Sequence, residues 1–73
     1  MIGKEIVKLS ARNQFPGKIL SVEEGAVNSI VKIDSSVGQI TATISNAAVK
    51  DLGLAKGVDA TAVIKATSVM VGR

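Results

Sequence analysis

The stretch that decides the fold is Gln39-Ile40-Thr41-Ala42-Thr43-Ile44-Ser45, in which apolar residues alternate with residues that carry a hydroxyl group. Successive side chains of a β-strand point to opposite faces of the sheet. The three apolar side chains would therefore share one face, and the hydroxyl side chains would share the other. This period of two predicts a half-buried strand over residues 39–45.

Similar alternating stretches lie on both sides of this strand, and their Val, Ile and Thr residues favour strands. In the stretch before it, Val31 and Ile33 would share a face with Ser29. Turn-forming residues such as Pro16-Gly17 and Glu24-Gly25 mark the boundaries. The further strands predicted in this way cover residues 17–24, 26–34, 58–65 and 68–72.

One short helix is predicted over residues 47–52. Asn46 can cap its N-terminus, and Gly53 can close its C-terminus in the left-handed conformation. Five strands with a helix between the third and the fourth are the elements of an OB-like Greek-key barrel. We therefore expect an all-β fold of this kind, and an SH3-like barrel is the nearest alternative.

The chain has 73 residues, which we expect to form a single domain over residues 1–73. A domain of this size buries only a modest core, and small folds usually need disulfides, a metal or oligomerisation. The sequence has no Cys and no His, so disulfides and the commonest metal ligands are excluded. The hydrophobic fraction of 47% and the mean hydropathy of +0.39 agree with buried subunit interfaces.

The net charge and the N-terminal residues limit which partners and which compartment are expected. The net charge is +3 and the pI is about 9.6, which suits an anionic ligand. Residues 1–7 contain an early Glu5 and no long apolar core, unlike a signal peptide. No apolar stretch approaches the roughly 20 residues of a membrane span. We expect a cytoplasmic protein that does not bind membranes.

The residue types argue against catalysis and against nucleic acid. There is no His, Cys or Tyr, and the adjacent Glu23 and Glu24 would point to opposite faces of a strand. We expect no enzyme. Barrels that bind single strands use aromatic stacking platforms, and Phe15 is the only aromatic residue. A small OB-fold nucleic-acid-binding protein stays open as the alternative, since a basic groove can bind a backbone without stacking. A module of a larger protein is a third possibility, against which the initial Met1 argues.

Three segments are rich in hydrogen-bond donors, and a tetrahedral oxyanion presents only acceptors. They are Ser10-Ala11-Arg12-Asn13-Gln14, Ser45-Asn46, and Lys65 with the following Ala66-Thr67-Ser68. Each alone has a simpler interpretation, as a polar loop, a helix cap and a lysine whose stem covers apolar surface. If strand pairing brought them together, they would form an anion-binding pocket without a catalytic base.

Four motifs occur together in the chain: SARNQFPGKI at residues 10–19, EEGAVNSIVKI at 23–33, ITATISNAAVKDLGL at 40–54 and VIKATSVMVG at 63–72. In this order they resemble the molbindins, small molybdenum-binding proteins whose domain recurs in molybdate-responsive regulators and transporter ATPases. The resemblance extends from about Leu9 to Gly72. It implies molybdate or tungstate bound at the subunit interfaces of a hexamer, a trimer of dimers, for intracellular molybdenum storage and homeostasis. It implies no organic cofactor and no direct bond from protein to metal.

The resemblance also implies which residues bind the oxyanion. The family's Ser-Ala-Arg-Asn segment matches Ser10, Ala11, Arg12 and Asn13, and its Lys-Ala pair matches Lys65 and Ala66. A hydroxyl residue that the family often has matches Ser45. Ala48 stands where the family often has a second hydroxyl, so only the backbone N–H would remain there. The loss of one neutral hydrogen bond is worth about 1 kcal/mol.

Overall fold

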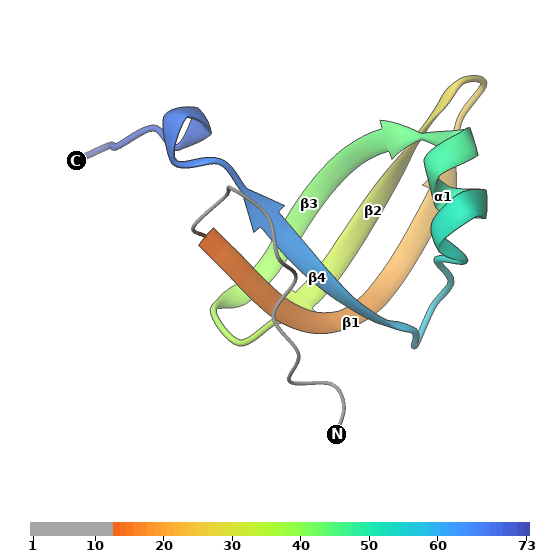
Figure 1. Ribbon diagram of the computed structural model, residues 1–73, viewed down its shortest axis with the longest axis horizontal. Helices are drawn as coiled ribbons and strands as arrows, with labels where there is room; N and C mark the ends of the chain where they lie inside the picture. The colour runs from red at the N-terminus through yellow and green to blue at the C-terminus, as the bar shows by residue number, and fades with distance from the viewer. Residues whose placement is uncertain (1–12) are drawn as a thin grey trace.

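A computed structural model describes residues 13–73, which form one antiparallel sheet and a short helix (Figure 1). The elements in chain order are β1 (Asn13–Glu24), β2 (Asn28–Ser35), β3 (Gly38–Ser45), α1 (Asn46–Leu52), β4 (Asp59–Ile64) and the 3-10 turn η1 (Ala66–Ser68). The all-β class and the single helix between the third and fourth strands are confirmed. Within the described range, no helix has the length and apolar character needed to cross a membrane.

The strands lie in the order β3-β2-β1-β4, with antiparallel pairing throughout. The fourth strand returns beside the first, which is the Greek-key arrangement expected for an OB-like fold. β1 pairs with β4 through Asn13–Lys18 and with β2 through Gly17–Glu24. The sheet curls strongly as a result, so that β4 crosses in front of β2 and β3 in Figure 1.

At Gly17, β1 pairs with both neighbouring strands, because this residue lies opposite Ser35 in β2 and Ala60 in β4. A Cβ atom at Gly17 would overlap the carbonyl oxygen of Asp34. The strands can therefore approach this closely only because the residue has no side chain.

A register shift between Ile19 and Ser21 marks a β-bulge at Leu20. At the bulge, the Ile19 N–H donates to the Val58 carbonyl at 2.9 Å, and the Gly57 N–H donates to the Ile19 carbonyl at 2.8 Å. The chain that enters β4 thus holds β1 where its pairing with β4 ends. A bulge bends its strand and increases the local twist, which lets one long strand join two neighbours.

The core is small, as expected from the chain length. Within residues 13–73, its buried apolar residues are Ile19, Val31, Ile33 and Ala62. The predicted faces are confirmed: in β2, Ser29 is buried with the two core residues of that strand, and in β3 the apolar side chains are half-buried while the threonines are exposed. Phe15 packs against the core from β1, so it is a packing residue.

The expected helix cap was wrong by one residue. Ser45 caps α1, since its Oγ accepts from the Ala48 N–H at 3.1 Å. Asn46 is the first residue of the helix, and its Nδ2 donates to the Gly25 carbonyl at 3.0 Å. The end of the helix is as predicted, because Gly53 is left-handed with φ of 63°.

The expected fifth strand at residues 68–72 is also wrong. Ala66–Ser68 form the turn η1, and the residues after it have no regular structure. The turn is closed by hydrogen bonds from the Ser68 N–H to the Lys65 carbonyl at 2.8 Å and from the Val69 N–H to the Ala66 carbonyl at 3.3 Å. It directs the chain away from the sheet (Figure 1), so the segment meets no strand partner within residues 13–73. Pro16-Gly17 does not precede the first strand either, because β1 begins at Asn13.

Replacement of Gly17 by Ala should lower the free energy of unfolding by about 1–3 kcal/mol, because the new methyl group would force β1 away from Asp34. Urea titration followed by circular dichroism at fixed protein concentration measures this change. Gly72→Ala is the matched control, since nothing lies within 4 Å of a Cβ there. Equal midpoints for the two variants would contradict the close approach at Gly17.

Candidate oxyanion site

The pairing of β1 with β4 brings two of the three donor-rich segments together. Asn13, the first residue of β1, lies opposite Ile64, the last residue of β4, and Lys65 and Ala66 follow directly. Asn13 is half-buried, whereas Lys65 and Ala66 are exposed. The antiparallel register therefore brings Asn13 and Lys65 to the same end of the sheet. Ser10, Ala11 and Arg12, which were expected to join this group, lie outside the described residues.

Lys65 carries a charge that no carboxylate neutralises within the described part of the chain. The ion pair found there joins Lys18 Nζ to Asp59 Oδ1 at 2.7 Å, and both side chains are exposed. Lys65 precedes η1 in an extended conformation, and its carbonyl accepts the hydrogen bond that closes the turn. The turn thus uses a backbone acceptor and leaves the ammonium group available to an anion.

The Ser45 segment lies elsewhere. Ser45 is the last residue of β3 and pairs with Asn28 at the start of β2, beside the β1–β2 loop. Figure 1 places this end of β3 and α1 on one side of the molecule and the start of β1 on the other. One chain therefore does not gather the predicted pocket. It presents two separate groups, one with Asn13, Lys65 and Ala66, and one with Ser45 and Ala48.

Ser45 and Ala48 are already bonded to each other. The backbone N–H of Ala48 donates to Ser45 Oγ, so it is not a spare donor for a ligand. The Ser45 hydroxyl keeps its own hydrogen, which can still donate. Two donors were predicted at this end of the sheet, the Ser45 hydroxyl and the Ala48 backbone N–H. Of these, the Ser45 hydroxyl is the one still available to a ligand.

Sequence reasoning missed the role of Asn46 at this end. The Ser29 hydroxyl donates to Asn46 Oδ1, and the Asn46 backbone N–H donates to the Val27 carbonyl at 2.8 Å. Together with the bond to Gly25, these contacts tie the start of α1 to the β1–β2 loop and so position Ser45. The sequence clue to this role was the position of Ser29 on the apolar face of its strand. Ser29 is 1% exposed, and a buried hydroxyl group almost always has a hydrogen-bond partner.

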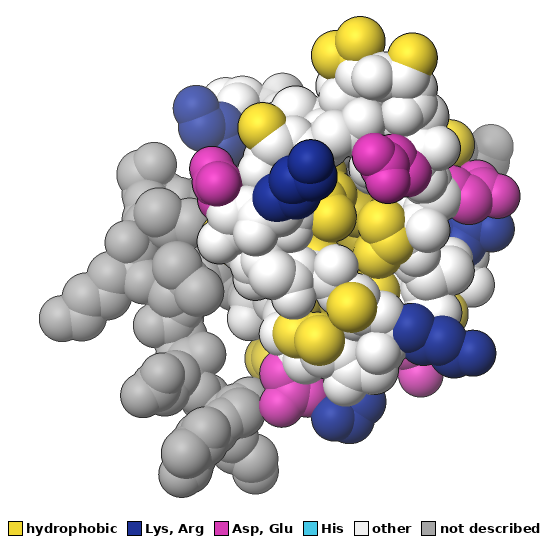
Figure 2. Space-filling view, turned by 90° about the vertical axis from the view of Figure 1, so that its right-hand side faces the viewer, with side chains coloured by type: hydrophobic (Ala, Val, Ile, Leu, Met, Phe, Trp, Pro, Cys, Tyr) yellow, Lys and Arg dark blue, Asp and Glu magenta, His cyan; other side chains and the backbone are white. Residues whose placement is uncertain are grey.

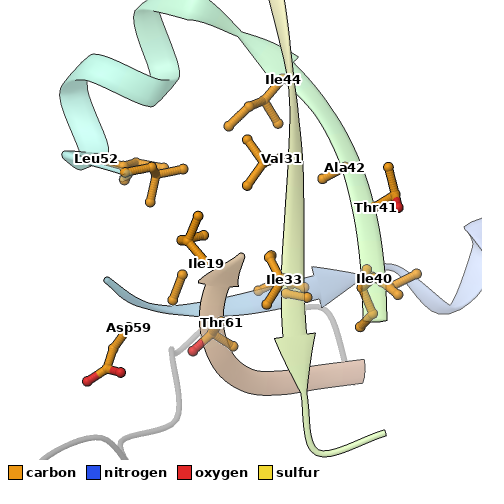
Figure 3. A pocket seen from close by; sticks show the side chains of 15 residues that line it. Ile19, Val31, Ile33, Ile40, Thr41, Ala42, Ile44, Leu52, Asp59 and Thr61 are labelled. Atoms are coloured by element: carbon orange, nitrogen blue, oxygen red, sulfur yellow. The ribbon is translucent and has the colours of Figure 1, made fainter. Parts of the chain in front are cut away.

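A cavity of about 570 Å³ opens on the inner side of the curled sheet. Figure 3 shows Ile19, Val31 and Ile33 pointing into it, and in Figure 2 apolar side chains form the floor of a hollow with charged groups around its rim. Its lining is mostly aliphatic, and Asp59 is the one charged residue among the described residues that line it. An anion there would lose water without gaining enough donors. The hollow is therefore not suited to an oxyanion.

The acidic residues in the described part of the chain form no cluster that could hold a metal ion. No group of three or more His, Cys, Asp or Glu side chains able to hold a metal ion occurs in residues 13–73.

Comparison with known proteins shows to which family the chain belongs. The TOBE domain matches residues 9–71. A probable molybdenum-pterin-binding protein of Haemophilus influenzae is 57% identical over 67 residues, which is 90% of this chain and 97% of that protein. Its sequence and this one thus correspond along nearly their whole lengths.

Two solved structures share the fold. MopII from Clostridium pasteurianum has a TM-score of 0.84 at 39% identity, over 90% of this chain and 100% of that one. The cytoplasmic molybdate-binding protein ModG, solved with molybdate bound, has a TM-score of 0.83 at 43% identity, over 88% of this chain and 46% of that one. The resemblance to the molbindins is confirmed, and the chain belongs to the TOBE domain family and, within it, to the molybdenum-pterin-binding proteins.

Proposed function

We propose that this protein binds molybdate, or tungstate, as an intact oxyanion and stores it without catalysis. The observation that carries the proposal is the register of β1 and β4, which sets Asn13 beside Lys65-Ala66. These are residues of the two segments that match the oxyanion-binding segments of the molbindins. Family membership and the molybdate-bound structure of ModG support the same ligand class.

The chemistry of these side chains suits a dianion. The Asn13 amide can donate two hydrogen bonds, and the Lys65 ammonium adds a positive charge that meets no carboxylate in the described part of the chain. Hydrogen bonds to charged groups are roughly twice as strong as neutral ones. Ser10, Ala11 and Arg12 complete this group in the proposal. Selectivity over sulfate then comes from cavity size, since molybdate has the same charge and shape but is larger.

The separation of the two donor groups favours an assembly. Because Ser45 and Ala48 lie at the other end of the sheet from Asn13 and Lys65, each group can face a different neighbouring subunit. We therefore propose a homo-oligomer, a hexamer built as a trimer of dimers, with the oxyanions at its seams. Ligands bound at a seam stabilise the assembly by mass action. The cytoplasm is the proposed compartment, since the related ModG is a cytoplasmic molybdate-binding protein.

The anion specificity is tested by isothermal titration calorimetry of the full chain with molybdate, tungstate and sulfate. We expect saturable binding of molybdate and tungstate and an affinity for sulfate at least about tenfold weaker, which corresponds to about 1.4 kcal/mol. Equal heats for the three anions, or no heat for any, would refute the proposed function.

Lys65→Ala should weaken molybdate binding by about tenfold or more, because a hydrogen bond to a charged group is worth about 1.5–3 kcal/mol. Lys56→Ala is the matched control, since it removes the same charge from an exposed position between α1 and β4. The two affinities are measured by calorimetry at one ionic strength. If both variants lost the same affinity, Lys65 would act only through the net charge.

Ala48→Ser should strengthen one class of site about fivefold, since it adds the hydroxyl donor that the family often has at this position and a neutral hydrogen bond is worth about 1 kcal/mol. Ala47→Ser, at the exposed neighbouring position of α1, is the control. Molybdate titrations of both variants give the comparison. An unchanged affinity for Ala48→Ser would place the ligand away from this end of the sheet.

A further inference from the structure

A buried polar pair lies on the apolar face of β2. Ser29 is 1% exposed and shares this face with the core residues Val31 and Ile33. Its hydroxyl donates to Oδ1 of Asn46, the first residue of α1. An apolar side chain at position 29 would continue the pattern of the strand, and replacing a buried polar pair by apolar groups of similar shape can leave stability nearly unchanged. The polar pair therefore indicates a task besides stability.

Asn46 holds the turn between β1 and β2 through three hydrogen bonds. Besides accepting from Ser29, its Nδ2 donates to the Gly25 carbonyl at 3.0 Å, and its backbone N–H donates to the Val27 carbonyl at 2.8 Å. The turn itself is tight, because the Gly25 N–H donates to the Asn28 carbonyl at 2.9 Å and a Cβ at Gly25 would lie 2.7 Å from the same oxygen. We call Ser29, Asn46 and the turn that they hold the asparagine clamp.

The clamp lies beside Ser45 both in the chain and in the sheet. Ser45 directly precedes Asn46, and it pairs with Asn28 where β3 meets β2. Ser45 is exposed, and its Oγ accepts from the Ala48 N–H at 3.1 Å. All these contacts are made within the protein and need no ligand. The position of the Ser45 hydroxyl is thus fixed from two sides, by the clamp and by α1.

We propose that the asparagine clamp makes the Ser45 end of the sheet selective for molybdate over sulfate, an inference that rests on the proposed oxyanion function. The two anions have the same charge and shape, so a site can distinguish them by size only if its donors do not close in on the smaller one. A donor held by buried hydrogen bonds keeps its position. Ser29 and Asn46 then act as positioning residues, because both act through the Ser45 hydroxyl and neither has to touch the anion.

The first test measures the ratio of the molybdate and sulfate affinities by calorimetry of the full chain, at the class of site that Ser45→Ala weakens. Ser29→Ala removes the hydroxyl that orients Asn46, so the ratio should fall about fivefold, the equivalent of one neutral hydrogen bond. Ser35→Ala is the matched control, because it removes a hydroxyl from the other end of β2, where Ser35 Oγ donates to the Gly38 carbonyl at 2.7 Å. An unchanged ratio for Ser29→Ala, or an equal fall for both variants, would overturn the proposal.

The second test asks whether Ser29 acts through Ser45. In a double-mutant cycle, Ser29→Ala should lower the ratio in the wild-type chain and leave it unchanged in a chain that already carries Ser45→Ala. A purely structural role would lower the ratio equally in both backgrounds. Equal losses, or a Ser45→Ala chain that binds molybdate as tightly as the wild type, would contradict the proposed role of the clamp.

The third test needs no variant, so it applies even if Ser29→Ala fails to fold. The Ala48 N–H donates to Ser45 Oγ at 3.1 Å, and the Val37 N–H makes a matching bond to Ser35 Oγ at 3.2 Å outside the clamp. Amide hydrogen exchange of the wild-type chain without ligand, measured by NMR and corrected for intrinsic rates, should be about tenfold slower at Ala48 than at Val37. Equal rates would refute the clamp, since the ligand would then have to position Ser45.

The inference and the proposed function can fail separately. If the wild-type chain prefers molybdate to sulfate but Ser29→Ala keeps the same ratio, the clamp is not the source of selectivity and the oxyanion function stands. If the wild-type chain prefers neither anion although Ala48 exchanges slowly, the proposed function is wrong and the clamp serves the fold alone.

Discussion

The close approach of β1 to two neighbours at Gly17 is the constraint on which the rest of the structure depends. One strand must hydrogen-bond β4 along its first half and β2 along its second. The missing side chain at Gly17 allows the crossing, and the bulge at Leu20 turns the strand after it. Because β1 bends here, the sheet curls, its inner face becomes a hollow, and the ends of β1 and β4 meet where Asn13 lies beside Lys65.

A curled sheet of four strands encloses only a small apolar core. Among the residues that the structure describes, four apolar residues are buried, and their apolar neighbours Ile40, Ile44 and Ala60 are only half-buried. Small domains without disulfides or metals usually gain the remaining stability from association. The separate positions of the two donor groups and the open inner face point in the same direction. The small core and the separated donor groups then both agree with the proposed homo-oligomer.

Side-chain pattern was a good guide to the faces of the strands and a poor guide to their partners. Alternation in residues 39–45 predicted β3 and its half-buried face correctly, and Gly53 marked the end of α1. A strand was also predicted at residues 68–72, but the sequence cannot show whether a strand edge is available to pair with it. Ser45 and Asn46 are equally good caps by residue type, and only the buried hydroxyl of Ser29 decides between them. For the site, residue types indicated donors, whereas the register was needed to show which donors meet.

The pairing of Asn13 with Ile64 also joins residues that lie far apart in the chain. β2 and β3 follow β1 closely in the chain and can form a meander from local contacts. The first half of β1 has to wait for β4, the last of the four strands to be synthesised. Contacts between such distant residues slow folding, because the intervening loop must close before they form. During that wait, the edge of β1 is open to other chains, and the arrival of β4 ends its exposure to aggregation.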